Sequence, residues 1–72
     1  MTLKTKEQYI AESWLSKNHI KVYSKLIQEN IYIIFYEIKN ICYTNGKEYN
    51  RNEIDNRLDN FILYLYNKFS NV

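Results

Sequence analysis

Apolar side chains recur at steps of three and four through the middle of this chain. Between residues 20 and 43 the recurring positions are Ile20, Tyr23, Ile27, Ile31, Ile34, Ile38 and Ile41. Residues at that spacing share one face of an α-helix. Tyr32, Tyr36 and Tyr43 fall on the opposite face of the same helix. Because a chain of 72 residues cannot bury both faces in one core, we expect the tyrosine face to contact another molecule.

Signals for helix ends divide the chain into three segments. Thr5, followed three residues later by Gln8, matches the capping box that opens a helix. Asn50 and Glu53 form a second pair at the same spacing. Gly46 suits the left-handed residue that closes a helix, and the sequence has no proline to interrupt one.

These boundaries predict helices at residues 5–16, 19–44 and 51–69. The last segment carries a second apolar stripe, made of Ile54, Leu58, Phe61, Ile62, Leu65 and Phe69. We therefore expect an all-α fold in a single domain of residues 1–72. Its two long helices would form an antiparallel helical hairpin, with the short N-terminal helix packed against it.

The competing interpretation is a β-structure in the middle of the chain. Residues 31–35 are rich in β-branched and aromatic side chains, and Asn45-Gly46 is a strong hairpin signal. A pair of strands would need matching apolar alternation after Gly46. Residues 47–52 are polar throughout apart from Tyr49, so the helical interpretation is favoured.

Charge and composition narrow the class of protein. The formal net charge is +2, from ten basic and eight acidic residues, with no basic block, so nucleic acid is not expected as the partner. A further alternative is a small nucleic-acid-binding helical protein that uses Lys17, Lys21, Lys25 and Lys39 beside stacking tyrosines. Heavy use of Ile, Asn, Lys and Tyr, all encoded by AT-rich codons, points to an AT-rich bacterium or phage.

A single cysteine and a single histidine limit the available chemistry. Cys42 has no partner for an intramolecular disulfide, and together with His19 it cannot complete a four-ligand zinc site. We expect no metal and no cofactor. A small domain without such supports is expected to gain stability by self-association, most simply as a homodimer through the long helix.

The chain is expected to work in the cytoplasm without crossing a membrane. No apolar stretch approaches the roughly 18 residues that span a bilayer. No charged segment followed by an apolar run marks a signal peptide. The lone thiol of Cys42 fits a reducing compartment.

The expected contact residues are those on the spare faces of the two long helices. They are Tyr32, Tyr36, Tyr43, Leu63 and Tyr66. The tyrosine face could also be covered by the first helix, which would make it part of the core. Because no catalytic constellation is found, we expect a non-enzymatic regulator, inhibitor or adaptor that binds another protein of unspecified identity.

From residue 30 onward the pattern resembles the Spo0E-like aspartyl-phosphate phosphatases of spore-forming bacteria. The apolar positions of their first helix are spaced like Ile31, Ile34, Ile38 and Ile41. A glycine closes that helix, as Gly46 would here. The signature Ser-Gln-x-Leu-Asp of their second helix is in register with residues 55–59, where Leu58 and Asp59 match.

This resemblance implies a helical hairpin and an alternative function as a phosphatase of response regulators. Asn56 and Asp59 would then contact the phosphorylated receiver domain and help to position water. Asp55 stands where the family has serine, and Asn56 where it usually has glutamine. Because of these departures, the resemblance implies a non-catalytic binding protein as much as an active phosphatase.

Overall fold

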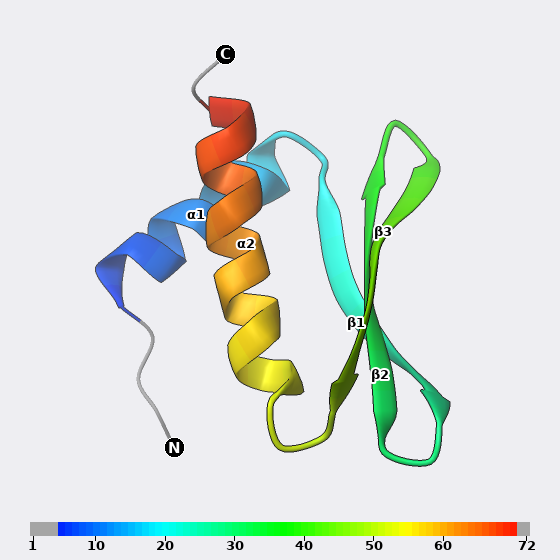
Figure 1. Ribbon diagram of the computed structural model, residues 1–72. Helices are drawn as coiled ribbons and strands as arrows, with labels where there is room; N and C mark the ends of the chain where they lie inside the picture. The colour runs from blue at the N-terminus through cyan, green and yellow to red at the C-terminus, as the bar shows by residue number, and fades with distance from the viewer. Residues whose placement is uncertain (1–4, 71–72) are drawn as a thin grey trace.

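The computed structural model describes residues 5–70 and combines two helices with one β-sheet. Along the chain the elements are α1 (Lys6–Lys17), β1 (Lys21–Gln28), β2 (Ile31–Ile38), β3 (Ile41–Asn50) and α2 (Ile54–Ser70) (Figure 1). The three strands form an antiparallel sheet in the order β1-β2-β3. The fold is therefore α+β, and the prediction of an all-α helical hairpin is wrong.

The segment predicted as a helix over residues 19–44 is instead most of the sheet. β2 is the central strand, and its sequence is apolar almost throughout, so that apolar side chains lie on both of its faces. Such a run fits a helical spacing and a strand equally well. Lys39 and Asn40 both have positive φ, at 53° and 68°, as the two-residue turn of a β-hairpin requires. Asn30, at φ 61°, occupies the corresponding turn between β1 and β2.

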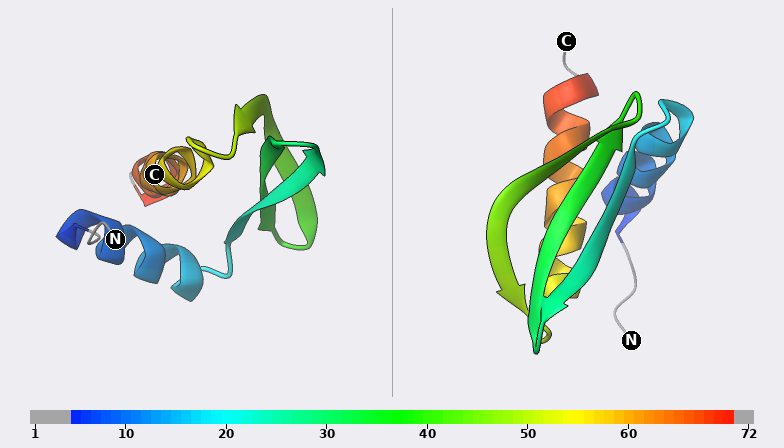
Figure 2. Two further views of the ribbon diagram at one scale, coloured as in Figure 1. Left: turned by 90° about the horizontal axis from the view of Figure 1, so that it is seen from below. Right: turned by 90° about the vertical axis from the view of Figure 1, so that its right-hand side faces the viewer.

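Both helices cover the same face of the sheet, so the molecule has two layers (Figure 2). Tyr36 pairs with Val22 on β1 and with Tyr43 on β3, and the three side chains share the face toward the helices. Tyr23 and Phe35 form the next cross-strand pair and lie on the opposite face. No element of residues 5–70 covers that outer face.

The core lies between the two helices and the sheet. Its most buried side chains are Ala11, Leu15, Ile20, Ile34, Ile54, Ile62 and Leu65. The apolar stripe predicted on the last helix is confirmed in part, since Ile54, Ile62 and Leu65 are buried. The isoleucines predicted to share one buried face are instead split between the core and the surface. Ile20 and Ile34 are buried, whereas Ile27 and Ile41 are 43% and 55% exposed.

The signals for helix starts are confirmed. The Thr5 hydroxyl accepts a hydrogen bond from the Gln8 amide at 3.2 Å. Asn50 and Glu53 form a reciprocal capping box before α2, with both hydrogen bonds at 3.1 Å. Gln8 uses its side chain differently, because its Nε2 donates to the backbone oxygen of Asp59 at 3.2 Å and ties α1 to α2.

Candidate protein-binding groove between α2 and β3

The three tyrosines predicted on a helix face lie on strands. Tyr36 and Tyr43 stack on each other with ring centroids 5.2 Å apart. Tyr36 also packs on Phe61 of α2 at 5.4 Å, so it is half-buried between the layers. The hydroxyl of Tyr32 accepts a hydrogen bond of 2.7 Å from Nη1 of Arg51. The sheet thus places these side chains on the side of α2, and a continuous tyrosine face on a helix does not exist.

Leu63 and Tyr66, the contact residues predicted on the last helix, pack toward α1. The ring of Tyr66 meets Trp14 edge to face at a centroid distance of 5.7 Å. Leu63 and Tyr66 both border the core and are half-buried. They also line a shallow depression with Glu7 and Ile10 of α1. Their contact with a partner stays a prediction.

The residues implied by the phosphatase resemblance lie on α2. Asn56 is exposed and Asp59 is half-buried. The helix that the family would have over residues 31–44 is replaced by β2 and part of β3. The two-helix platform that presents the signature is therefore not formed, while the activity itself stays untested.

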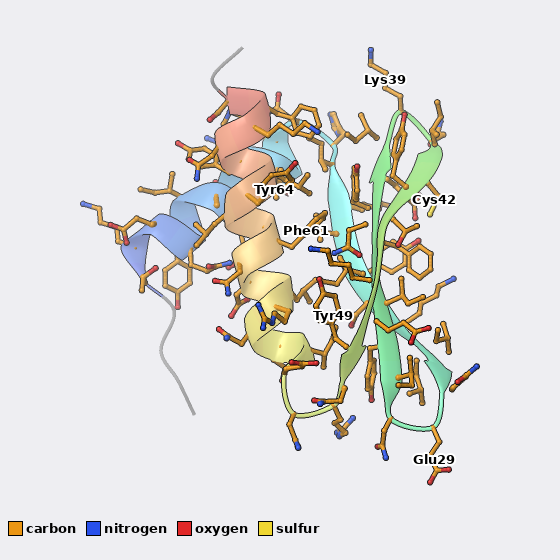
Figure 3. The ribbon with its side chains drawn as sticks, viewed as in Figure 1. Glu29, Lys39, Cys42, Tyr49, Phe61 and Tyr64 are labelled. Carbon is orange, nitrogen blue, oxygen red and sulfur yellow. The ribbon has the colours of Figure 1, made fainter. Side chains whose placement is uncertain are left out.

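A groove opens where the end of β3 passes α2. Its volume is about 410 Å³, and its lining residues are Asn45, Lys47, Tyr49, Arg57, Asn60, Phe61 and Tyr64. Figure 3 shows Tyr49 on β3 facing Phe61 and Tyr64 on α2. Residues about ten positions apart in the sequence are brought together because the chain reverses between β3 and α2.

The β3 wall is shaped by an irregularity in the strand. The register with β2 shifts between Ile33 and Phe35, so residues 45–47 bulge from the ladder. Gly46 has φ 72°, a conformation that glycine adopts without a steric penalty. The bulge turns Asn45 and Lys47 toward α2, where both line the groove.

Four hydrogen bonds hold the bulge in place. The Thr44 hydroxyl donates to the Ile34 carbonyl at 2.9 Å and accepts from the Gly46 amide at 3.1 Å. The Lys47 amide donates to Oδ1 of Asn45 at 3.2 Å. Nδ2 of Asn45 then donates to the Tyr49 hydroxyl at 2.9 Å. This wall of the groove is therefore preorganised rather than a loose loop.

Phe61 and Tyr64 form the apolar part of the groove and belong to a longer row of aromatic rings that continues between α2 and the sheet. Phe61 lies 5.7 Å from Tyr64 and 5.4 Å from Tyr36, which in turn stacks on Tyr43. Tyr64 is 53% exposed, so the outer end of the row is open to a ligand. Stacked and tilted aromatic rings give large contact area with few rotamers to immobilise.

The charge of the groove has one sign. Lys47 on β3 and Arg57 on α2 are both exposed cations, and none of its seven lining residues is acidic. Asn45 and Asn60 add amide groups that can donate hydrogen bonds. The groove thus presents positive charge and hydrogen-bond donors around an aromatic floor, which suits a short anionic ligand with an apolar or aromatic side chain.

Sequence reasoning did not find this groove. Tyr49 is the one apolar residue in the polar segment 47–52, and the spacing of Phe61 predicts a member of the apolar stripe on the last helix. Lys47 and Arg57 show no common spacing on a helix, so only the pairing of β3 with β2 reveals that they face each other. The dipeptide Asn45-Gly46 was the one available signal, and it marks a bulge rather than the end of a helix.

No family model, curated protein or solved structure matches this chain. Within residues 5–70, no group of three or more His, Cys, Asp or Glu side chains is arranged to hold a metal ion. Neither α1 nor α2 combines the length and apolar character that a membrane-crossing helix needs.

Proposed function

We propose that this chain is a small, non-catalytic cytoplasmic protein that regulates, inhibits or links another protein by binding it. The bound element would be a short acidic segment of the partner, held in the groove between α2 and β3. The observation that carries the proposal is that Lys47 and Arg57 both line a groove that has an aromatic floor and no acidic lining residue.

The proposed binding mode follows from the chemistry of the walls. An acidic side chain of the partner would pair with Arg57, whose planar guanidinium can hold a carboxylate through two hydrogen bonds. Lys47 would attract a second carboxylate as a point charge. A neighbouring apolar or aromatic side chain would pack on Phe61 and Tyr64.

A short segment fits better than a long polyanion. Glu53 and Asp55 precede Arg57 at the start of α2. Their carboxylates would repel a nucleic-acid backbone that continued past the groove along this end of α2. Acidic protein segments with single apolar anchors do not need a long cationic track, so they are favoured over RNA or DNA.

The experiment is calorimetric titration of the full chain with short peptides of matched length. One peptide carries glutamates flanking a phenylalanine, and the reference peptide carries lysines at the same positions. The acidic peptide is expected to bind at least about tenfold more tightly, a difference in binding free energy of about 1.4 kcal/mol.

Matched charge reversals locate the binding. Lys47→Glu and Arg57→Glu are each expected to abolish the preference for the acidic peptide. Lys6→Glu makes the same change of charge in the first turn of α1, which contributes no residue to the groove lining, and is expected to retain the preference. An acidic preference that survives Arg57→Glu, or a tighter interaction with oligothymidylate than with the peptide, would contradict the proposal.

A further inference from the structure

A second open surface lies on the outer face of the sheet, away from both helices (Figure 2). At its centre Tyr23 of β1 stacks on Phe35 of β2, with ring centroids 5.9 Å apart and planes inclined by 22°. Nζ of Lys25 lies 5.8 Å and 5.7 Å from the centroids of these two rings. Ile33 shares this face as the cross-strand partner of Lys25.

Polar neighbours hold the Tyr23 ring across the face. Its hydroxyl lies 3.6 Å from Sγ of Cys42 on β3, the strand two positions away. A hydrogen bond to Cys42 makes the largest contribution to the raised pKa of the Tyr23 hydroxyl, and a hydrogen bond to Glu37 makes the second largest. Both favour the protonated phenol. The face is therefore an ordered platform made of side chains from all three strands.

The charges on this platform follow the strand order. Lys25 of β1 pairs with Ile33 of β2, which pairs with Glu48 of β3. One row across the sheet thus runs from a cation through an apolar residue to an anion. In a second row, Lys21 pairs with Glu37, and Glu37 pairs with Cys42. The β1 side of the platform is basic, and the β3 side carries Glu48.

We propose that the occupant of this face is a second copy of the chain, packed sheet to sheet about a two-fold axis parallel to the strands. Such an axis places β1 of each copy over β3 of the other and keeps each row in register. Lys25 of each copy then meets Glu48 of the second copy. Ile33 and Phe35 lie near the axis and pack on their own counterparts.

The charge pattern selects this arrangement over the other face-to-face one. A two-fold axis perpendicular to the strands would place β1 over β1 in opposite directions, so that Lys21 would oppose Lys25. Like charges in contact disfavour a complex. With the axis along the strands, Glu37 meets its counterpart, but Lys21 is the cross-strand partner of each Glu37 within its own sheet, and its charge would offset part of that repulsion.

The area of the outer sheet face sets the expected affinity of the dimer. Three strands of eight to ten residues cover roughly 27 Å by 14 Å, from the usual rise per residue and strand spacing. Buried face to face, this footprint of roughly 380 Å² on each copy amounts to roughly 760 Å² in total, which belongs to the weak, transient class of interfaces below about 1,200 Å². The dimer is expected to form reversibly at micromolar concentration. The dimer expected through a helical tyrosine face is thereby replaced by one through the outer face of the sheet.

The test is sedimentation velocity of the full chain over the micromolar range. Wild type is expected to show a reversible monomer–dimer equilibrium. Lys25→Glu and Glu48→Lys each place like charges in both contact rows, so each alone is expected to weaken the dimer by at least about tenfold. An equimolar mixture of the two variants restores both opposite-charge contacts, and a heterodimer of wild-type strength is expected.

Recovery of dimer strength on mixing would have to come from contacts between the two chains. Within one chain Lys25 and Glu48 are not neighbours, because they lie on the two outer strands with β2 between them. Circular dichroism establishes that each variant is folded, and Lys6→Glu serves as the charge-matched control. A wild type that stays monomeric, or a mixture that stays as weak as its components, would overturn the proposal. Peptide binding in the groove is independent of this interface, since Lys25→Glu is expected to leave it unchanged.

Discussion

The ring of Tyr36 on β2 lies 5.4 Å from the ring of Phe61 on α2, measured between centroids. This contact joins the sheet to the helical layer and also anchors the floor of the groove. Phe61 therefore has a structural role in addition to the binding role proposed for it. The two roles are separable, because Tyr64 lies at the open end of the same aromatic row.

Replacing Phe61 by alanine is expected to lower the free energy of unfolding by about 2–4 kcal/mol, since it leaves a cavity beside a partly buried ring. Chemical denaturation monitored by circular dichroism measures the loss. Tyr64→Ala is the matched control and should cost less than about 1 kcal/mol, because an exposed ring contributes little to the core. Equal losses in the two variants would contradict the position assigned to Phe61.

Gln8 is the one buried polar side chain of residues 5–70, at 5% exposure, and it bridges the two helices. Gln8→Leu keeps most of the volume but removes the donor to the Asp59 carbonyl. We expect a loss of about 1–3 kcal/mol in unfolding free energy, because that carbonyl loses its side-chain donor. Thermal denaturation compares this variant with Glu7→Leu, whose position beside Gln8 is exposed. A neutral Gln8→Leu would show that the hydrogen bond contributes nothing.

The capping box before α2 gives a third prediction. Asn50→Ala removes the acceptor for the Glu53 amide and should destabilise the protein by about 1 kcal/mol. Asn52→Ala changes an exposed turn residue between Asn50 and Glu53, and it is expected to leave the free energy of unfolding unchanged. Glu53→Ala removes the other hydrogen bond of the box, from the Asn50 amide to Oε1 of Glu53, and is expected to destabilise the protein by a similar amount. Neutral results for both Asn50→Ala and Glu53→Ala would contradict the reciprocal box.

The hydroxyl of Tyr23 should release its proton at a higher pH than a tyrosine in a model peptide. Its pKa is raised from the ordinary value of 10.0, first by Cys42 and then by Glu37. Since the raised value belongs to the folded state, the stabilising contribution is complete below about pH 10 and is lost at higher pH, where the unfolded chain releases its proton first. Ultraviolet titration of tyrosinate should therefore lose a transition at raised pH in Tyr23→Phe. Retention of that transition would contradict the hydrogen bonds assigned to Tyr23.

Part of the fold could be predicted from local signals. Thr5 and Asn50 were identified as helix caps because capping depends on residues only three positions apart. The burial of Ile62 and Leu65 follows from a period that only a helix explains. These features need no knowledge of the rest of the chain.

The sheet could not be predicted by the same reasoning. In β2 nearly every residue is apolar, so periods of two and of 3.6 residues fit equally well. The decisive residues are Asn30 and Asn40, two asparagines at positive φ that separate strands of eight, eight and ten residues. Asparagine tolerates that conformation, which permits two-residue turns without glycine.

The candidate site was beyond sequence reasoning for a related reason. Lys47 and Arg57 face each other only because β3 pairs with β2 and α2 then turns back along it. The tyrosines at 32, 36 and 43 were recognised as unusual for a helix. Their explanation is that Tyr36 and Tyr43 form a stacked cross-strand pair on the helix-facing side of the sheet.

The most direct test of the proposed function is chemical-shift mapping of the isotope-labelled chain during titration with the acidic, phenylalanine-containing peptide. The account predicts that the largest saturable changes occur at Lys47, Tyr49, Arg57, Phe61 and Tyr64, and that they disappear in Arg57→Glu. Saturable changes confined to the outer sheet face around Tyr23 and Phe35, with the groove unaffected, would contradict it.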